Sequence, residues 1–226
     1  MITLYQFKSC PFCSKVRSLL NFTKQPYEIV EVSPRGMKEL DFTDHKKVPV
    51  LKDGDKVIVE SATIIEYINE NYAKLPVTDE DKKWTDWLDN KLVHYLPALI
   101  HPDFKTSRSN IKKINPIGGF TGFLIPFVGA LVMPKVARRM KEKYNIKDPK
   151  SEYLEGIDHW INDGLKGKSF YGDNEPSFVD CSVFGVLSSG HQLGTVKMAK
   201  DHNKDFALWY DKCYPLMSDD RLSHSE

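Results

Sequence analysis

The chain has 226 residues, enough for one large domain or two small ones. Its 32 Lys and Arg side chains nearly balance 31 Asp and Glu side chains, so no global charge attracts it to nucleic acid. An apolar share of 41% with 12% aromatic residues excludes the disordered, collagen and coiled-coil classes. Four cysteines are too few for a secreted disulfide scaffold, and they favour reduced thiols in a cytosol-like compartment.

Residues 1–75 carry alternating strand and helix patterns. The first strand pattern covers 2–7, and no charged or apolar leader precedes it, so either the mature chain starts here or a leader has been removed. Pro11 suits the first turn of a helix, and Asp53-Gly54 predicts a hairpin turn. We expect a thioredoxin-like α/β domain with strand 2–7, a helix from 11, strand 27–32, a helix at 34–42, strands 48–51 and 56–60, and a helix after residue 61.

The pattern changes after Leu75, and we expect a linker at about residues 74–79. Thr78 followed by three acids predicts the N-cap of a helix. Ser177 with Asp180 three residues later predicts a second capped helix, buried and devoted to folding. Because no convincing strand pattern follows the linker, we expect an all-α domain at 79–226.

Residues 114–133 form a run of 20 uncharged residues, the length of a membrane-spanning helix. Pro116, Pro126 and several glycines lower the helix propensity of this run, which favours a soluble helix or hairpin lining an apolar groove. Eleven Lys and Arg side chains but only two acids lie between residues 105 and 150. This charge suits either an anionic membrane surface or a solvated helix face, so peripheral membrane contact of a cytoplasmic protein stays open.

The strongest chemical signal is Cys10-Pro11-Phe12-Cys13, which lies between an expected strand and an expected helix. Free N–H groups at a helix N-terminus stabilise a thiolate, and Lys8 and Lys15 add positive charge nearby, so we expect Cys10 to be the nucleophile. Cys13, one turn further on, can resolve a mixed disulfide. No second C-x-x-C or histidine pair completes a zinc site, so we predict no metal.

Two further motifs point to a thiol tripeptide as ligand. Val48-Pro49 fits the position at which thioredoxin-like folds expose a backbone beside a cis proline to a bound thiol peptide, although this dipeptide by itself is an ordinary strand start. Glu60-Ser61 at a helix start can bind both ends of an amino-acid zwitterion, or Ser61 can be a simple N-cap. Together with Cys10 they favour glutathione as the ligand.

These motifs resemble a known superfamily. The segments CPFCSKVR, VPVL and VES resemble the glutaredoxin-like half of glutathione transferases, and GDNEPSFVDCSVFG resembles a helix start in their all-α domain. More narrowly, LYQFKSCPFCSKVR, PYEIVEVSP, KKVPVL and WLDNKLVHYL resemble the membrane-associated prostaglandin E synthase type 2 family. The resemblance implies a homodimer that uses glutathione on a lipid endoperoxide such as prostaglandin H2, with haem bound in some members.

The resemblance also assigns residue roles. It implies that Cys10 and Cys13 are catalytic, that glutathione contacts Cys10, and that the substrate or haem pocket includes Phe7 and His94. The implied glutathione-binding residues, besides Cys10, are Phe12, Val48, Pro49, Glu60 and Ser61. The family usually has a tyrosine at the position of Phe7, so this chain has no phenol there. A lone helical histidine such as His94 is more often a packing residue than a ligand.

Three functions remain open from the sequence. The first is endoperoxide isomerisation with an apolar, lipid-like substrate lying between the domains. The second is glutaredoxin-like thiol–disulfide exchange, which the intact Cys10 and Cys13 pair favours. The third is a non-catalytic protein that binds glutathione and haem or docks on membranes through residues 105–150. Cys181 and Cys213 lie in apolar surroundings and are expected to be inert core residues.

Overall fold

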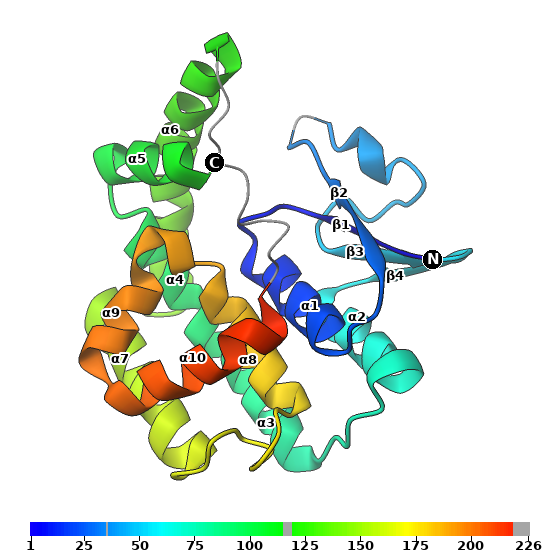
Figure 1. Ribbon diagram of the computed structural model, residues 1–226. Helices are drawn as coiled ribbons and strands as arrows, with labels where there is room; N and C mark the ends of the chain where they lie inside the picture. Colours follow the sequence, from blue (N-terminus) through cyan, green and yellow to red (C-terminus); the bar gives the residue numbers. More distant parts are fainter. Residues whose placement is uncertain (35, 115–118, 219–226) are drawn as a thin grey trace.

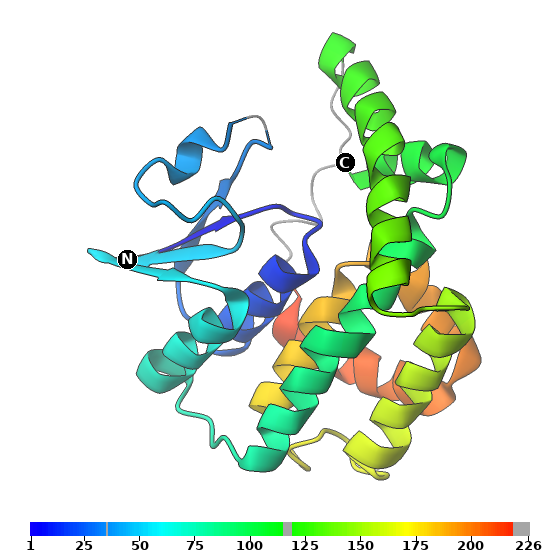
Figure 2. The same cartoon turned by 180° about the vertical axis from the view of Figure 1, so that it is seen from behind.

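The computed structural model describes residues 1–34, 36–114 and 119–218, with the side chains of 119–123 left aside. A four-stranded sheet with its helices forms one half of the molecule, and a bundle of helices forms the other (Figure 1). Seen from behind, the hairpin of α5 and α6 projects from the helical half, while α1 lies where the two halves meet (Figure 2).

The sheet has the strand order β2-β1-β3-β4. Strands β1 and β2 are parallel, and the other two pairings are antiparallel. One face packs on two helices through the apolar residues of β1, and a small cluster on the other face includes Val32, Leu40 and Val50. This half contains β1 (Ile2–Gln6), α1 (Pro11–Phe22), β2 (Tyr27–Glu31), η1 (Lys38–Leu40), β3 (Val50–Asp53), β4 (Lys56–Val59), α2 (Ser61–Ile68) and the π-helical turn η2 (Asn69–Ala73). The expected thioredoxin-like arrangement is therefore confirmed.

Two sequence expectations in this half are wrong in detail. The helix expected at 34–42 is reduced to the 3-10 turn η1, because Gly36 and Met37 both have positive φ angles (81° and 47°) that end helical geometry. Strand β3 begins two residues later than expected, at Val50. Pro49 has no N–H to donate to the sheet, so the ladder starts after it.

The other half is helical throughout its described residues, apart from an isolated bridge between Phe170 and Asp173. Thr78 and Ser177 both form complete capping boxes, as their spacing predicts. The elements are α3 (Asp79–Trp87), η3 (Leu88–Leu92), α4 (Val93–Ile100), α5 (Phe104–Ile114), α6 (Gly119–Lys143), α7 (Pro149–His159), η4 (Trp160–Leu165), α8 (Phe178–Ser188), η5 (His191–Leu193), α9 (Thr195–His202) and α10 (Lys204–Met217).

Helix α8 is the centre of the helical half. All but the last of its residues are buried, including Phe178, Cys181, Phe184 and Leu187 along one side of the helix. The Asp180 carboxylate is fully buried and accepts five hydrogen bonds, from the N–H groups of 171, 172 and 177, the Ser177 hydroxyl and the Trp209 indole. A buried charge with this many donors ties the helix start to the preceding loop and to α10.

Helices α1 and α8 cross at very close range. A Cβ added at Gly185 would lie 2.5 Å from the Lys15 Cα, so only glycine fits at this crossing. The Lys15 ammonium is fully buried and pairs with Asp89 at 2.6 Å, and the Ser14 and Ser188 hydroxyls are hydrogen-bonded at 3.0 Å. The position of α1 is therefore fixed by the helical half as well as by the sheet.

No helix among residues 1–34, 36–114 and 119–218 is both long enough and apolar enough to cross a membrane. Part of the uncharged run lies in α6, which contains Pro126 and Pro134. Four apolar side chains of α6 are 39–49% exposed: Phe127, Val128, Leu131 and Val132. Residues 115–118 of the run lie outside the described residues.

Candidate thiol site

The pairing of the strands brings the predicted motifs to one edge of the sheet. Tyr5 pairs with Val50, which pairs with Val59. Strands β1 and β3 are antiparallel, and so are β3 and β4. Phe7 comes two residues after Tyr5, Val48 two residues before Val50, and Ser61 two residues after Val59, so all three lie at the same end of the strands. Helices α1 and α2 begin beside this edge, so their unpaired N–H groups face the same region.

Cys10 is the N-cap of α1 and is partly exposed, whereas Cys13 is buried. A hydrogen bond from Cys13, helped by the backbone N–H groups of 12 and 13 and by the Arg17 charge, outweighs burial and lowers the pKa of Cys10 from 9.0 to about 7. Burial and the neighbouring Cys10 raise the pKa of Cys13. Cys10 therefore has the more acidic thiol of the pair, and Cys13 stabilises its thiolate as a hydrogen-bond donor.

Arg17 is the nearby cation that contributes to this shift, and the sequence interpretation missed it. Its guanidinium is buried, and it donates to the Gln6 side chain and to the Lys8 carbonyl at 3.0 Å. The signal was available, because Arg17 follows Cys13 by four residues and so lies on the same face of α1. Lys15, which we expected to supply positive charge, instead pairs with Asp89 and is not among the causes of the shift.

The two motifs expected at the glutathione site lie at the same edge. The Val48-Pro49 bond is cis. Glu60 is exposed and has a positive φ of 65°, and Ser61 begins α2 and is nearly buried. His45 also lies in this region: its Nε2 is 4.0 Å from a Glu60 carboxylate oxygen, and its side chain is 19% exposed.

The structure separates the two residues implied for a substrate or haem pocket. Phe7 packs with Val48 and Tyr5 beside the sheet edge, so an aromatic ring without a hydroxyl lies near the thiol. His94 is in α4, and its ring stacks on Tyr144 with centroids 3.6 Å apart. Burial and the Lys143 charge lower the pKa of His94.

The remaining cysteines are buried in the helical half. Cys181 and Cys213 are at most 1% exposed, and burial raises the pKa of each thiol. A protonated, inaccessible thiol does not react with electrophiles. The prediction that both lie in the core is confirmed.

A thioredoxin-like half with an N-capping cysteine, joined to an all-α half, is the architecture of the glutathione transferases. The family described as glutathione S-transferase, N-terminal domain, matches residues 4–76. Solved structures share the fold over nearly the whole chain. A tau-class glutathione S-transferase from mango is 20% identical with a TM-score of 0.60, covering 98% of this chain and 95% of that one. Rice GST1 in complex with glutathione is 16% identical with a TM-score of 0.62, covering 94% and 86%.

Residues 4–76 thus match the N-terminal domain of the glutathione transferase superfamily, and the whole chain shares the fold of that superfamily. Within it, the chain is similar to prostaglandin E synthase 2 of Danio rerio, with 28% identity over 93% of this chain and 70% of the relative. It is 27% identical to prostaglandin E synthase 2 of Mus musculus over 82% of this chain and 62% of the relative. The chain thus spans between three fifths and three quarters of these relatives.

Proposed function

We propose that this protein uses the Cys10 thiolate together with glutathione to isomerise a lipid endoperoxide, as the names of its relatives suggest. The observation that carries the proposal is the pKa of Cys10, lowered to about 7 at the start of α1. A thiol with this pKa is about half ionised at pH 7, so it attacks weak electrophiles without a separate base.

Glutathione is proposed to lie along the sheet edge. Its cysteine backbone would pair with Val48 beside Pro49, and its sulfur would face Cys10 and Phe12. Its γ-glutamyl carboxylate would accept from Ser61 and the first N–H groups of α2, while its ammonium would face Glu60. The positive φ of Glu60 supports this arrangement, because it turns that residue out of the strand just before the helix begins.

The endoperoxide step needs no added oxidant or reductant. The thiolate, from Cys10 or from glutathione, attacks one peroxide oxygen, so that a sulfur–oxygen bond forms and the oxygen–oxygen bond breaks to leave an alkoxide. The carbon bearing the sulfur-bound oxygen then loses its proton to the alkoxide. A carbonyl forms there, the thiolate leaves, and the product is a hydroxy ketone isomeric with the substrate. Phe7 contributes no proton, so the thiol carries the step.

Thiol–disulfide exchange is the second candidate, favoured by the hydrogen bond between Cys13 and Cys10. The Cys10 thiolate would attack the glutathione sulfur of a mixed disulfide and release the other thiol. A second glutathione would then attack the new Cys10–glutathione disulfide, which yields glutathione disulfide and restores the thiolate. Cys13 is dispensable in this route.

Glutathione-coupled reduction of a small mixed disulfide distinguishes the two candidates, with wild type, Cys10→Ser and Cys13→Ser compared. If the protein is an isomerase, it should bind glutathione but reduce the mixed disulfide only slowly. It should also convert an endoperoxide, and Cys10→Ser should abolish this conversion. Rapid disulfide turnover that Cys13→Ser retains, with no endoperoxide conversion, would replace the first candidate by the second.

Haem, which the resemblance implies for some members, fits His94 poorly. Tyr144 covers one face of the imidazole at 3.6 Å, and the Lys143 ammonium lies 4.8 Å from the Tyr144 ring centre. No step above uses haem. A purified sample without a Soret band after incubation with haem and glutathione is the expected result.

Peripheral membrane contact of a cytoplasmic protein is proposed for α6, supported by its four exposed apolar side chains and by basic residues further along the helix. The wild-type protein should co-sediment with anionic liposomes, whereas the triple variant Lys135→Ala, Arg138→Ala, Arg139→Ala should remain in the supernatant. Full sedimentation of the variant would eliminate the basic residues as the cause of membrane binding.

A homodimer is also proposed from the resemblance, and sedimentation velocity of the purified protein tests it.

A further inference from the structure

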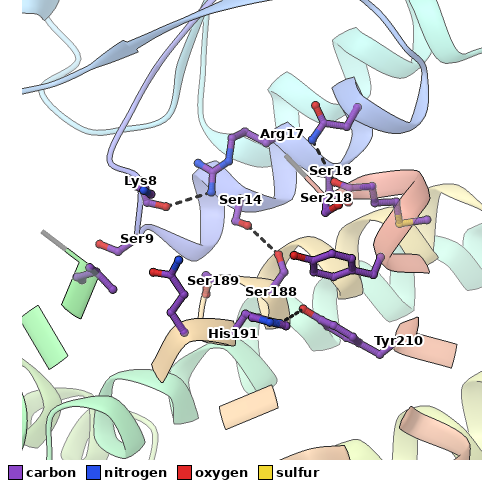
Figure 3. A pocket seen from close by; sticks show the side chains of 15 residues that line it. Lys8, Ser9, Ser14, Arg17, Ser18, Ser188, Ser189, His191, Tyr210 and Ser218 are labelled. Atoms are coloured by element: carbon purple, nitrogen blue, oxygen red, sulfur yellow. Dashed lines mark hydrogen bonds between the residues drawn. The ribbon is translucent and has the colours of Figure 1, made fainter. Parts of the chain in front are cut away.

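A cavity of about 130 Å³ lies on the side of α1 that faces the helical half. Its walls come from the loop before Cys10, from α1, and from the end of α8, η5 and α10 (Figure 3). Six of its described lining residues are serines, and none is an aspartate or glutamate: Ser9, Ser14, Ser18, Ser188, Ser189 and Ser218 are the serines. Such a wall offers many hydrogen-bond donors and no competing carboxylate.

The Ser18 hydroxyl is the first sign that something is missing from this cavity. Ser18 is 2% exposed, and its Oγ has no hydrogen-bond partner. The neighbouring Ser14 hydroxyl is satisfied by Ser188. A buried hydroxyl that lacks a partner costs stability unless a ligand or water supplies one.

The Arg17 guanidinium is the second sign. It is 6% exposed and lines the same cavity, yet no carboxylate of the described residues forms an ion pair with it. Its hydrogen bonds go to the neutral acceptors Gln6 and the Lys8 carbonyl, which use two of the five N–H donors of a guanidinium. Figure 3 shows Arg17 extending toward Lys8 above the Ser14–Ser188 pair. A buried guanidinium that has no paired carboxylate and has N–H donors to spare favours binding of an anion.

We propose that this cavity binds a small organic carboxylate, held by Arg17 and Ser18. A carboxylate matches the planar donor array of a guanidinium and accepts the Ser18 hydroxyl with its remaining lone pairs. His191 donates to or accepts from Tyr210 at 3.1 Å on the far wall, where a polar tail of the ligand would find it. Cys10, Val48 and Ser61 are not among the residues that line this cavity, so this ligand would be additional to glutathione. The proposal does not depend on the reaction proposed above.

Calorimetric titration of the full chain with succinate, acetate and inorganic phosphate, at ionic strength fixed with sodium chloride, tests the proposal. Succinate should bind saturably. Arg17→Gln should weaken it at least tenfold, and Ser18→Ala about three- to tenfold, as expected for loss of one charge-assisted and one neutral hydrogen bond. Arg139→Gln on α6 is the matched control and should bind as wild type does.

Ser18→Ala keeps the test valid if Arg17→Gln fails to fold. Because the Ser18 Oγ makes no hydrogen bond, this variant should melt at or above the wild-type temperature in the absence of ligand. Equal succinate binding by Ser18→Ala and wild type would overturn the proposal. Phosphate binding tighter than both carboxylates would overturn the carboxylate assignment, and succinate displaced by glutathione would show that the site is not separate.

Discussion

Replacing Cys13 with alanine should slow alkylation of Cys10 at neutral pH and accelerate it at high pH. The Cys13 side chain is the largest of the groups that lower the pKa of Cys10 to about 7, and alanine removes its S–H donor. Burial of Cys10 opposes ionisation. Without the donor, the pKa of Cys10 should therefore rise toward its ordinary value of 9.0.

The size of the effect follows from these two values. At pH 7 about half of Cys10 is thiolate in the wild type, against about 1% for a thiol of ordinary pKa, a roughly 50-fold loss. A thiolate reacts faster when the pKa of its thiol is higher, by roughly six- to tenfold for an increase of two pKa units. The net rate at pH 7 should fall about five- to eightfold, and at pH 10 it should exceed that of the wild type.

The assay is iodoacetamide labelling between pH 5 and pH 10, with modification of the Cys10 peptide followed by mass spectrometry. Cys13→Ser is the matched control, since its hydroxyl keeps a donor in place and should hold the midpoint nearer to 7. A Cys13→Ala profile that coincides with the wild type would refute the reasoning. It would assign the ionisation of Cys10 to the helix N–H groups and Arg17.

Three substitutions test the buried contacts described above, with the free energy of unfolding measured by urea denaturation. Asp180→Ala should cost about 3–5 kcal/mol, because it removes the buried carboxylate that accepts five hydrogen bonds and leaves the buried Trp209 N–H without an acceptor. Gly185→Ala should cost about 1–3 kcal/mol, because the new methyl meets the backbone of α1 at 2.5 Å. Asp89→Asn should cost about 3–5 kcal/mol, because the buried Lys15 loses its counter-ion.

Each of these variants has a control in the chain. Asp201→Asn breaks an exposed pair with Lys197 and should cost under about 1 kcal/mol. Gly156→Ala meets only the end of the Leu92 side chain, which can move, so it should cost less than Gly185→Ala. If the Asp180 or Asp89 variant unfolds at the same urea concentration as Asp201→Asn, the buried carboxylate in question has no structural role.

Local chemistry explains which parts of the structure were predictable. Thr78 was predicted to be an N-cap from the three acids that follow it, and Ser177 from the acid three residues later, since helix starts are specified within one turn. Cys10 was predicted to be the nucleophile from its place between a strand and a helix. The error at 34–42 arose because the propensities there permit a helix, while Met37 has a positive φ that its residue type does not announce.

The rest of the site depends on contacts that are distant in sequence. Asp89 is 74 residues from Lys15, so nothing near Lys15 indicated that its charge is neutralised. His45 reaches Glu60 only because the loop before β3 folds back over the end of β4. The position of Arg17 on the Cys13 face of α1 was predictable, but its burial was not, because a basic residue on a helix is usually exposed.

Helix α1 is held both by the sheet and by the helical half, and this limits which other domains either half of the chain could be joined to. Without the helical half, the thioredoxin-like half would expose the Lys15 ammonium, which is buried in the intact protein. It would also expose the face of α1 that packs against Gly185. A graft onto a different helical partner would have to supply both a carboxylate opposite Lys15 and a residue without a side chain opposite its Cα. The two halves are therefore a matched pair, and neither is an interchangeable module.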